Sequence, residues 1–502
     1  MTALVWFKRD LRITDHQPLY QAAKQGAVLP AYIIEPDYYQ QPDVSIRHWQ
    51  FVAPALVELD KRLRELGQPL VVVKGPASKV LRQLCQRFHI TAVYSHEETG
   101  NLWTYQRDIA VQQQLAELNI PWHQYRQFAV FRPLPNRDHW FERADSWLKS
   151  SLCPEVTQLP FLADTRWDLT ELAPVKARDL PLCAEVQHAK HEDEIWQSFI
   201  AMRSVNYQRH ISLPAKAVTS CSRLSPFISY GLVSLRQLQQ QTYIQSKQAS
   251  SQQQQRGLQA FFSRLRWHCH FMQKLEDEPA IEFYNMHPGF DGLREHEFNN
   301  DYFTAWKSGN TGYPLIDAAM RCLLATGWLH FRARAMLVAF ACYHLWLHWR
   351  PVALHLAQCF VDYEPGIHYP QVQMQAGTTG INPNRMYNPV KQSQLKDTDG
   401  QFIRQWLPEL RHVPITWLHT PWLMPLALQQ RYGCIIGRDY PAPLIDLQYA
   451  QQQAKAKLSY WLAQHKTEWS KQKQAVFQRH ASRKRPISKR NTNNHNQLKF
   501  DW

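Results

Sequence analysis

The sequence predicts two domains: an N-terminal α/β domain built on a doubly wound parallel sheet, followed by a large all-α domain. Three observations predict this fold class. The chain of 502 residues is longer than one hydrophobic core organises. Short apolar runs alternate with amphipathic helical segments through residues 1–130, as in α/β proteins. Over residues 196–470 the strand signals are gone and helical periodicity continues.

Strand-length apolar runs and helical segments alternate in the first domain. The expected strands are 3–7, 27–34, 69–75, 90–96 and 120–125. The expected helices are 48–67, 80–88 and 108–118. Buried strands separated by helices favour a parallel sheet, which binds ligands at the carboxyl ends of its strands. No GxGxxG motif occurs here, so a dinucleotide cradle is not predicted in this domain.

The rest of the chain divides into a connector, a helical domain and a tail. Residues 131–195 hold many prolines and few periodic runs, which indicates a connector that wraps the surface. In the helical domain, residues 196–470, amphipathic helices are expected at 195–202, 235–246, 257–275, 314–326, 332–348 and 450–465. Residues 471–502 are basic and polar and are expected to be disordered. The basic cluster at 483–490 can contact phosphates or serve only solubility.

The composition favours a polyanionic partner. The net charge is +15 and the isoelectric point about 9.3, which indicates nucleic acid before membrane. A solvated basic surface is the alternative. Nine cysteines without a CxxC pair fit reduced thiols, and MTALVWFKRDLR is no signal peptide, so we expect a cytoplasmic protein. The longest apolar stretch, 335–347, is too short to span a bilayer.

Several runs in the helical half carry the chemistry, at 220–234, 311–336, 360–392 and 400–410. The first places Ser222 and Ser225 at a helix start, which is a ready anion site. Together these runs resemble the FAD-binding domain of DNA photolyases and cryptochromes. LVWFKRDLRITDHQPL at 4–19 resembles the family's N-terminal strand, and RDYPAPLID at 438–446 its closing segment. The resemblance covers about residues 1–465 and implies FAD as cofactor.

The resemblance implies cofactor-binding roles for Tyr207, Cys221, Ser222, Arg223, Leu224, Ser225, Arg334, Asp362, Glu364 and His368. Residues 222–225 match the loop that holds the pyrophosphate. Cys221 stands where the family commonly has threonine, and the spacing to Tyr207 differs by two residues. Arg334 is expected to face the isoalloxazine edge and to pair with Asp362, a plain interhelical salt bridge being the alternative. Glu364 is expected near the flavin or the adenine.

His368 is the main departure from the family's cofactor site. It matches the position that faces flavin N5, where photolyases usually carry asparagine. An imidazole can donate or accept a hydrogen bond and titrates near neutrality. We therefore expect His368 to influence, in a pH-dependent way, which one-electron flavin state accumulates. A register shift of one residue, with Ile367 or Tyr369 at this position, is the alternative.

The electron path is altered at its inner end. Trp306 and Trp349 match the two outer members of the family's tryptophan chain. Val372 replaces the tryptophan nearest the flavin, with Met374 two residues on. The candidates for a replacement relay are Tyr343, Trp346, Tyr369 and Trp328. Core packing is the alternative reading of each.

The expected catalytic residues are Trp267, His330, Arg264 and His368. Trp267 matches the tryptophan that stacks on a flipped-out pyrimidine dimer. Arg264 replaces the glutamate that hydrogen-bonds a cyclobutane dimer, and Phe331 replaces the asparagine that follows His330. A (6-4) photolyase would carry histidine at both 330 and 331. Neither known repair pocket is reproduced, and Arg264 can instead bind a phosphate or a small anion.

The same resemblance bears on partners and further cofactors. Arg332 and Arg385 match arginines that contact the DNA backbone. The four cysteines after residue 320 lack cluster spacing, so neither an iron–sulfur cluster nor another metal is expected. Glu98 and Asn101 are candidates to hold a second antenna chromophore of pterin or flavin type, with a solvated loop as the alternative. A monomer is expected.

These observations favour light-driven repair of damaged DNA, single- or double-stranded, by an FAD-dependent photolyase. Such an enzyme passes an electron from photoexcited reduced FAD to a pyrimidine lesion. The alternative is a cryptochrome-type blue-light photoreceptor with the same fold, and a third is a light-independent flavin or nucleic-acid binding protein. The basic charge and Trp267 favour repair, whereas Arg264, Phe331 and Val372 favour divergence.

Overall fold

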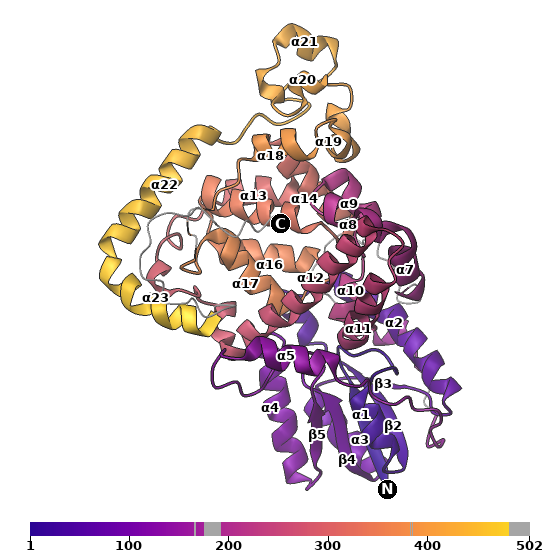
Figure 1. The fold of residues 1–502 in the computed structure, drawn as a ribbon. Coiled ribbons are helices and arrows are strands. Elements are labelled where there is room, and N and C mark those ends of the chain that lie inside the picture. The colour runs from indigo at the N-terminus through magenta and orange to yellow at the C-terminus, as the bar shows by residue number, and fades with distance from the viewer. Residues whose placement is uncertain (165–166, 175–191, 382, 384, 481–502) are drawn as a thin grey trace.

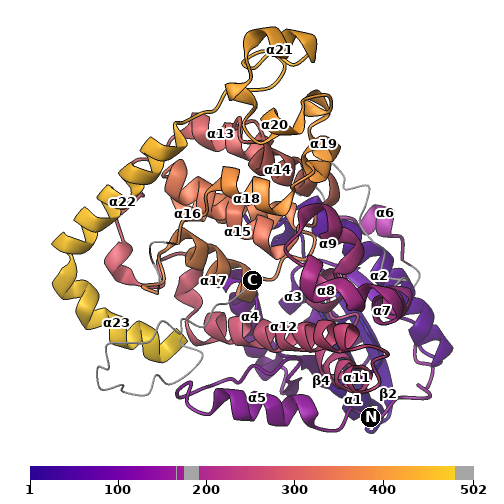
Figure 2. The ribbon, with the colours of Figure 1, turned by 45° about the horizontal axis from the view of Figure 1, so that its top comes forward.

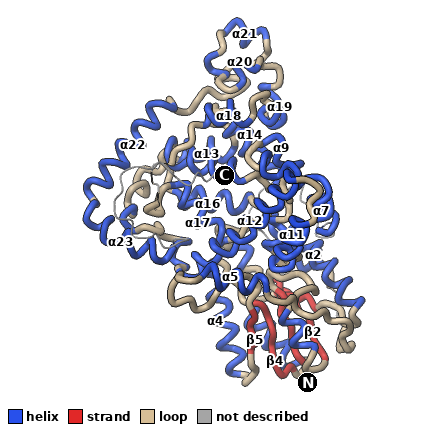
Figure 3. Tube along the Cα trace, viewed as in Figure 1, coloured by secondary structure: helices blue, strands red, loops and turns tan. Residues whose placement is uncertain are grey.

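The computed structural model describes residues 1–164, 167–174, 192–381, 383 and 385–480. Its N-terminal part is a five-stranded parallel sheet with strand order β3-β2-β1-β4-β5. The strands are β1 (Thr2–Phe7), β2 (Ala27–Ile34), β3 (Val71–Lys74), β4 (Ile90–His96) and β5 (Trp122–Tyr125). The connecting helices are α1 (Gln17–Ala23), α2 (Ile46–Glu65), α3 (Ala77–Arg87) and α4 (Leu102–Glu117). Figures 1 and 3 show this sheet at one end of the molecule and helices in the rest, which confirms the predicted fold class.

The two faces of the sheet bury different cores, because successive residues of a strand point to opposite sides. Leu4 and Trp6 of β1 pack with residues of α3 and α4. Val5 and Phe7 pack with α1, α2 and residues of the helical domain. The strand order reverses between β1 and β4. The edge that follows these two strands is therefore the place where such sheets bind ligands.

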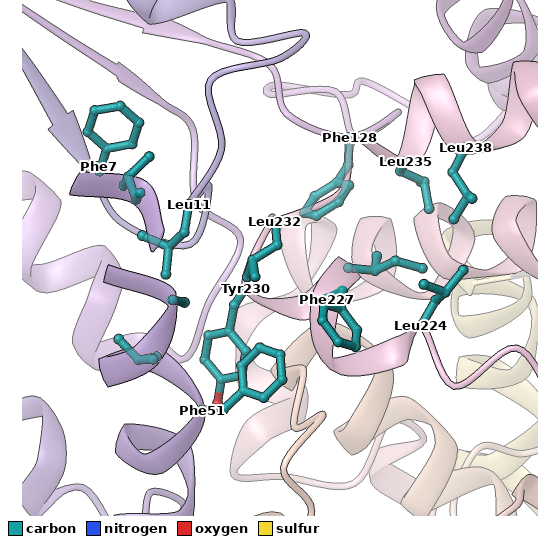
Figure 4. Packing of buried hydrophobic residues seen from close by; sticks show 14 of the residues in the cluster. Phe7, Leu11, Phe51, Phe128, Leu224, Phe227, Tyr230, Leu232, Leu235 and Leu238 are labelled. Atoms are coloured by element: carbon teal, nitrogen blue, oxygen red, sulfur yellow. The ribbon is translucent and has the colours of Figure 1, made fainter. Parts of the chain in front are cut away.

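One hydrophobic core runs from the sheet into the helical domain. Figure 4 shows Phe7 and Leu11 from the sheet side of this core and Phe51 from α2, with Phe227 and Tyr230 from the helical domain. The Phe51 ring stacks on Tyr230, with ring centroids 5.2 Å apart, and meets Phe227 edge-on at 5.3 Å. The α/β domain therefore braces the helical domain through packed side chains rather than through a flexible linker.

The helical domain is assembled mainly from α12, α14, α15, α16 and α17, which cross near its centre in Figures 1 and 2. The bounds are α7 (Glu192–Ser198), α8 (Ser204–His210), α9 (Pro214–Ser220), α10 (Ser225–Ser229), α11 (Leu235–Lys247), α12 (Gln252–Asp277), α13 (Asn300–Ser308), α14 (Pro314–Thr326), α15 (Phe331–Ala339), α16 (Trp349–Cys359), α17 (Pro365–Ala376), α18 (Pro389–Lys396), α19 (Gln401–Trp406), α20 (Ile415–Leu418), α21 (Leu426–Arg431), α22 (Leu447–Gln464) and α23 (Lys466–His480). The expected helices 235–246 and 314–326 agree with α11 and α14 to within one residue.

The expected helix 332–348 is wrong beyond residue 344. A π-helical turn at Phe340–His344 continues α15, and the chain then reverses at Trp346, whose φ is +54°. Helix α16 begins anew at Trp349 with Pro351 in its first turn, where the missing N–H of proline costs no hydrogen bond. This break places the Trp349 ring 6.5 Å from that of Tyr369 on α17.

Short helices occur in the described part of the connector, and a helix continues into the segment expected to be disordered. The connector contains α5 (Trp140–Lys149) and α6 (Leu169–Leu172). Disorder from residue 471 is wrong up to residue 480, because α23 continues to His480. The ring of Trp469 stacks on His287 at 5.5 Å, and His480 is 2.6 Å from the Glu278 carboxylate. These contacts hold α23 against the helical domain, and the basic cluster at 483–490 lies outside the described residues.

In the parts of the chain that the structure describes, none of the helices combines the length and the apolar character that crossing a membrane requires.

Candidate active site

A cavity of about 330 Å³ opens in the helical domain between α8, α12, α15 and α17. The predicted site residues that line it are Tyr207, Cys221, Ser222, Arg223, Ser225, Arg264, Trp267, His330, Arg332, Arg334, Asp362, Glu364 and His368. Leu224 lies in the shared hydrophobic core instead. Trp306, Trp349 and Arg385 also lie outside the lining. The structure thus brings together most residues that the sequence motifs single out, from Tyr207 to His368 along the chain.

Arg334 and Asp362 form the expected ion pair at the cavity wall. Two parallel hydrogen bonds of 3.0 and 2.8 Å join the guanidinium to the two carboxylate oxygens. The Nε–H of Arg334 also donates to the Leu329 carbonyl at 2.6 Å, and the guanidinium lies 4.0 Å from the centroid of the Phe360 ring. A paired charge held in this way has a fixed orientation, which a single-point contact would not provide.

The loop before α10 presents hydroxyl and guanidinium groups. Ser222 Oγ accepts a hydrogen bond from the backbone N–H of Leu224 at 3.4 Å. Arg223 has a φ of +61°, and its guanidinium lies 4.1 Å from the centroid of the Trp328 ring. Burial raises the pKa of the Cys221 thiol to about 12, so this side chain stays neutral and offers only a weak S–H donor. Ser222, Ser225 and Arg223 therefore present hydroxyl and guanidinium groups suited to an anion at this wall.

Glu364 joins the cavity to the α/β domain, a connection that the motif reading did not predict. Arg9, which follows β1, donates to the Tyr363 carbonyl at 2.7 Å and lies 3.4 Å from the Glu364 carboxylate. Burial raises the pKa of Glu364 to about 7 despite this neighbour. Arg9 also donates to the Ser229 carbonyl at 2.9 Å. The only sequence signal that Arg9 connects the two domains was its place in the motif at 4–19.

His368 lines the cavity but does not titrate near neutrality. Its Nε2 is 2.9 Å from the Ala353 carbonyl, so the neutral ring carries its proton on Nε2 and leaves Nδ1 as an acceptor. Burial lowers the pKa of His368 to about 4. Desolvation outweighs the attraction of Asp362, which argues against the expected pH dependence between pH 5 and 8, and that dependence stays a prediction for the FAD-loaded protein.

Aromatic side chains connect Trp349 to the cavity wall. Its ring centroid is 6.5 Å from that of Tyr369, which in turn is 5.5 Å from that of His368. The Tyr369 hydroxyl donates to Asp43 at 3.2 Å, and the Tyr363 hydroxyl donates to the same carboxylate at 2.5 Å. A buried phenol beside a carboxylate can release its proton when it loses an electron, so Tyr369 has the surroundings of a redox-active tyrosine.

The other relay candidates lie elsewhere. Tyr343 and Trp346 belong to a separate cluster packed against α22. Trp328 lies against Arg223 at the anion-binding wall. Trp306 is fully buried, and its Nε1–H donates to the Leu337 carbonyl at 3.1 Å. Of the four candidates, Tyr369 is the one whose ring contacts, among the described residues, reach both Trp349 and His368 of the cavity wall.

Arg264, Trp267 and His330 lie on the cavity wall with distinct chemical properties. Arg264 is within hydrogen-bonding reach of the Tyr207 hydroxyl. The Trp267 ring packs 5.9 Å from Phe271 on the same helix. His330 caps α15, since its Nδ1 accepts from the Ala333 N–H at 3.5 Å. Burial and nearby arginines lower the pKa of His330 to about 3, so at neutral pH it is a hydrogen-bond donor through Nε2 and not an acid.

The candidates for a second chromophore have other partners. Glu98 accepts from Arg107 at 2.6 Å. Asn101 caps α4 and donates to Asp43 at 3.0 Å. The hollow at this edge of the sheet measures only about 50 Å³. These side chains hold the loop and the domain interface together, and the second chromophore stays a prediction.

The charged groups expected to contact DNA occupy two positions. Arg332 lines the cavity, whereas Arg385 lies outside it, 5.7 Å from the centroid of the Tyr387 ring. Arginines dominate the charges of the cavity lining, with Arg223, Arg264, Arg332 and Arg334 against Asp362 and Glu364. The cavity wall is therefore suited to anionic ligands.

The donor set fits the chemistry of FAD. Hydroxyls and guanidinium groups at 222–225 suit a pyrophosphate, and the apolar side chains of Val338, Leu356, Phe360 and Val372 suit a planar ring. The Arg334–Asp362 pair adds fixed charges beside these apolar groups. The volume also lies within the range of cofactor sites.

Comparison with known proteins agrees with this fit. Residues 3–135 match the family model "DNA photolyase", and residues 261–460 match "FAD binding domain of DNA photolyase". The chain is 28% identical to a deoxyribodipyrimidine photo-lyase of Alkalihalophilus pseudofirmus over 90% of the chain and 96% of the relative. It is 27% identical to cryptochrome-2 of Arabidopsis thaliana over 89% of the chain and 77% of the relative.

Solved structures show the same fold. A class III photolyase of Agrobacterium tumefaciens superposes with a TM-score of 0.80 at 24% identity, over 92% of this chain and 97% of that one. The two matching family models cover both domains, and the relatives include photolyases and cryptochromes alike. The chain belongs to the photolyase/cryptochrome family, whose members use FAD either to repair DNA or to sense blue light.

Proposed function

We propose that the protein is a photolyase-type lyase that binds pyrimidine lesions in DNA at the cavity and reverses them in light. The observation that carries the proposal is that Trp267, Arg264 and Arg332 share one cavity with the residues suited to FAD. A stacking surface and positive charge beside the cofactor are what an extruded base and its phosphates require. The net charge of +15 supports the same partner.

Each residue of the cavity has a specific part in this proposal. When bound, FAD supplies the light absorption and the one-electron chemistry. Trp267 stacks on the lesion and Arg332 holds a phosphate. His330 donates a hydrogen bond from Nε2, since its pKa of about 3 excludes proton donation as an imidazolium at neutral pH. The Arg334–Asp362 pair fixes the charge beside the cofactor.

A cryptochrome-type photoreceptor is the second candidate. Two departures from the cyclobutane photolyases favour it. By the resemblance, Arg264 replaces their glutamate and Phe331 replaces their asparagine. Both residues line the cavity. In this case the cavity would hold FAD and bind no lesion.

A repair assay separates the two candidates. FAD-loaded protein is illuminated with blue light in the presence of DNA that carries one cyclobutane or one (6-4) lesion, single- or double-stranded. Reversal in light and none in the dark is expected. Trp267→Ala should weaken lesion binding roughly ten- to hundredfold, because stacking contributes about 1–3 kcal/mol per base. A protein that binds FAD, responds to light and reverses none of the lesions would be a photoreceptor instead.

The aromatic connection gives a second expected result. Trp349→Phe and Tyr369→Phe should each strongly slow the light-driven reduction of bound FAD, because each removes one redox-active ring between the interior and the cavity wall. Transient absorption measures this rate. Tyr343→Phe is the matched control, since its ring lies in another cluster. Equal rates in all three variants would show that electrons take another route.

A further inference from the structure

Two glutamines of α17 line the cavity with carboxamide atoms that have no partner among the described residues. Gln371 and Gln375 both line it, one helical turn apart. Among the described residues, neither Nε2 nor Oε1 of Gln375 has a hydrogen-bond partner, and neither does Oε1 of Gln371. Gln375 is only 2% exposed, so water does not compensate. Buried polar atoms are normally hydrogen-bonded, and atoms of this kind mark a site that a ligand completes.

The third glutamine of this helix segment shows what a structural role looks like. Gln373 donates to the carbonyls of Ile281 and Tyr284 at 2.8 Å each, and its Oε1 accepts from the Met286 N–H at 2.7 Å. Its side chain is fully satisfied within the protein. Gln371 and Gln375 lie on the other face of α17, the face that lines the cavity. Their lack of partners therefore follows from the cavity and not from loose packing of the helix.

Gln375 lies at the end of α17 that is remote from the charged pair of the cofactor site. Arg334 and Asp362 act electrostatically on His368, near the start of the helix. Seven residues separate His368 from Gln375, which is about 10 Å along the axis at the helical rise of 1.5 Å per residue. Beyond Gln375 the chain enters the loop that carries Arg385. Gln375 thus lies at the end of α17 from which the chain continues to Arg385.

The neighbouring groups suit a nucleobase. A carboxamide carries a donor and an acceptor side by side, which is the complement of the amide edge of a base. His330 adds another donor, because its Nε2 has no partner among the residues that the structure describes. Trp267 lines the same cavity and offers a ring on which the base can stack.

We propose that Gln371 and Gln375 are specificity-determining residues, which hydrogen-bond the amide edge of an extruded pyrimidine stacked on Trp267. The inference rests on the repair function proposed above and names the groups that read the substrate. It also explains how a pocket with arginine at 264 and phenylalanine at 331 can still recognise a pyrimidine. The isoalloxazine ring has a similar amide edge, so the experiment must separate cofactor from substrate.

Equilibrium binding in the dark makes this separation. FAD-loaded protein is titrated against duplexes of one sequence, either undamaged or carrying a cyclobutane or a (6-4) lesion, and polarisation is recorded. Gln371→Leu and Gln375→Leu should each lower the preference for lesion-bearing over undamaged duplex at least about fivefold, the low end for a bidentate base contact. Affinity for undamaged duplex, FAD content and melting temperature should stay at parent values, since leucine leaves no unsatisfied atom. Gln452→Leu, exposed on α22, is the matched control.

Three results would overturn the inference, each in a distinct way. If the leucine variants lose FAD, the carboxamides hold the cofactor and not the substrate. If the parent prefers a lesion and both variants keep that preference, the repair function stands and another group reads the base. If the parent itself prefers no lesion, the repair function fails and this inference fails with it. A variant that melts at lower temperature is replaced by Gln375→Glu, which keeps the shape and exchanges the amide donor for an acceptor.

Discussion

Acidification from pH 6.5 to pH 4.5 is expected to destabilise the folded protein by several kcal/mol per pH unit. Among the described residues, burial lowers the pKa of seven histidines to about 3 or 4: His48, His96, His268, His330, His344, His355 and His368. The unfolded chain protonates these groups near pH 6.5, whereas the folded protein keeps them neutral. The contribution of each histidine to the unfolding free energy is therefore complete above pH 6.5. It falls by about 1.4 kcal/mol per pH unit below that pH.

Buried glutamates oppose this loss without cancelling it. Burial raises the pKa of Glu35, Glu282 and Glu364 to about 7. A glutamate whose pKa is raised in the folded protein contributes most to the unfolding free energy below pH 4.5, and this contribution is lost as the pH rises to 7. These three groups therefore add unfolding free energy on acidification. Within this set, three glutamates add unfolding free energy on acidification and seven histidines remove it, so the unfolding free energy falls. Urea unfolding at pH 7.5, 6.5, 5.5 and 4.5 measures it, and a midpoint that does not move would contradict the expectation.

A single substitution tests the cause. His344 stacks on Phe340 at 5.4 Å, and His344→Phe preserves its size and removes its titration. The slope of unfolding free energy against pH should fall by about 1.4 kcal/mol per unit between pH 6.5 and 4.5. The same exchange at the exposed His412, His412→Phe, is the matched control for the substitution itself.

Replacement of Arg334 by alanine is expected to release FAD and to lower the unfolding free energy by about 3–5 kcal/mol. The reason is that Asp362, almost fully buried, loses both hydrogen bonds and its oppositely charged partner. Absorbance at 450 nm per chain and chemical unfolding measure the two effects. Arg334→Lys keeps the charge but not the paired geometry, so it should recover part of the stability and little of the cofactor.

The Arg321–Glu409 pair provides the control for this result. Its closest atoms are 2.7 Å apart, like those of the cavity pair, but the side chain of Glu409 is 18% exposed, against 3% for Asp362. Arg321→Ala should therefore cost less than Arg334→Ala, about 1 kcal/mol, and retain FAD. If Arg334→Ala behaves in the same way, the cavity pair is an ordinary interhelical salt bridge.

The sequence was most informative where burial is continuous. Strands 27–34 and 90–96 are mostly apolar and buried, because both faces of a covered parallel sheet are buried, and both have the predicted bounds. The break at Trp346 was not predicted, since the periodicity of 332–348 continues through it. Pro351 was the available signal, as it favours a helix start just before it.

The candidate site was predictable as a set of residues but not as a chemical environment. The motifs identify Arg334, Asp362 and His368, and these residues line one cavity. The protonation of His368 depends on its depth and on the Ala353 carbonyl, neither of which a motif contains. The lack of partners at Gln375 is likewise a property of the surrounding space, so only the assembled structure reveals it.

The hydrophobic core that passes from Phe7 through Phe51 to Tyr230 has a consequence for how the molecule unfolds. Few contacts join folding units that are independent of each other. Here, a chain cut near residue 130 would expose to water the aromatic rings that the α/β domain and the helical domain bury together. Sheet and cofactor cavity should therefore melt in one transition. A fragment that ends or begins there would aggregate, and a substitution in β1 would be felt as far away as the flavin.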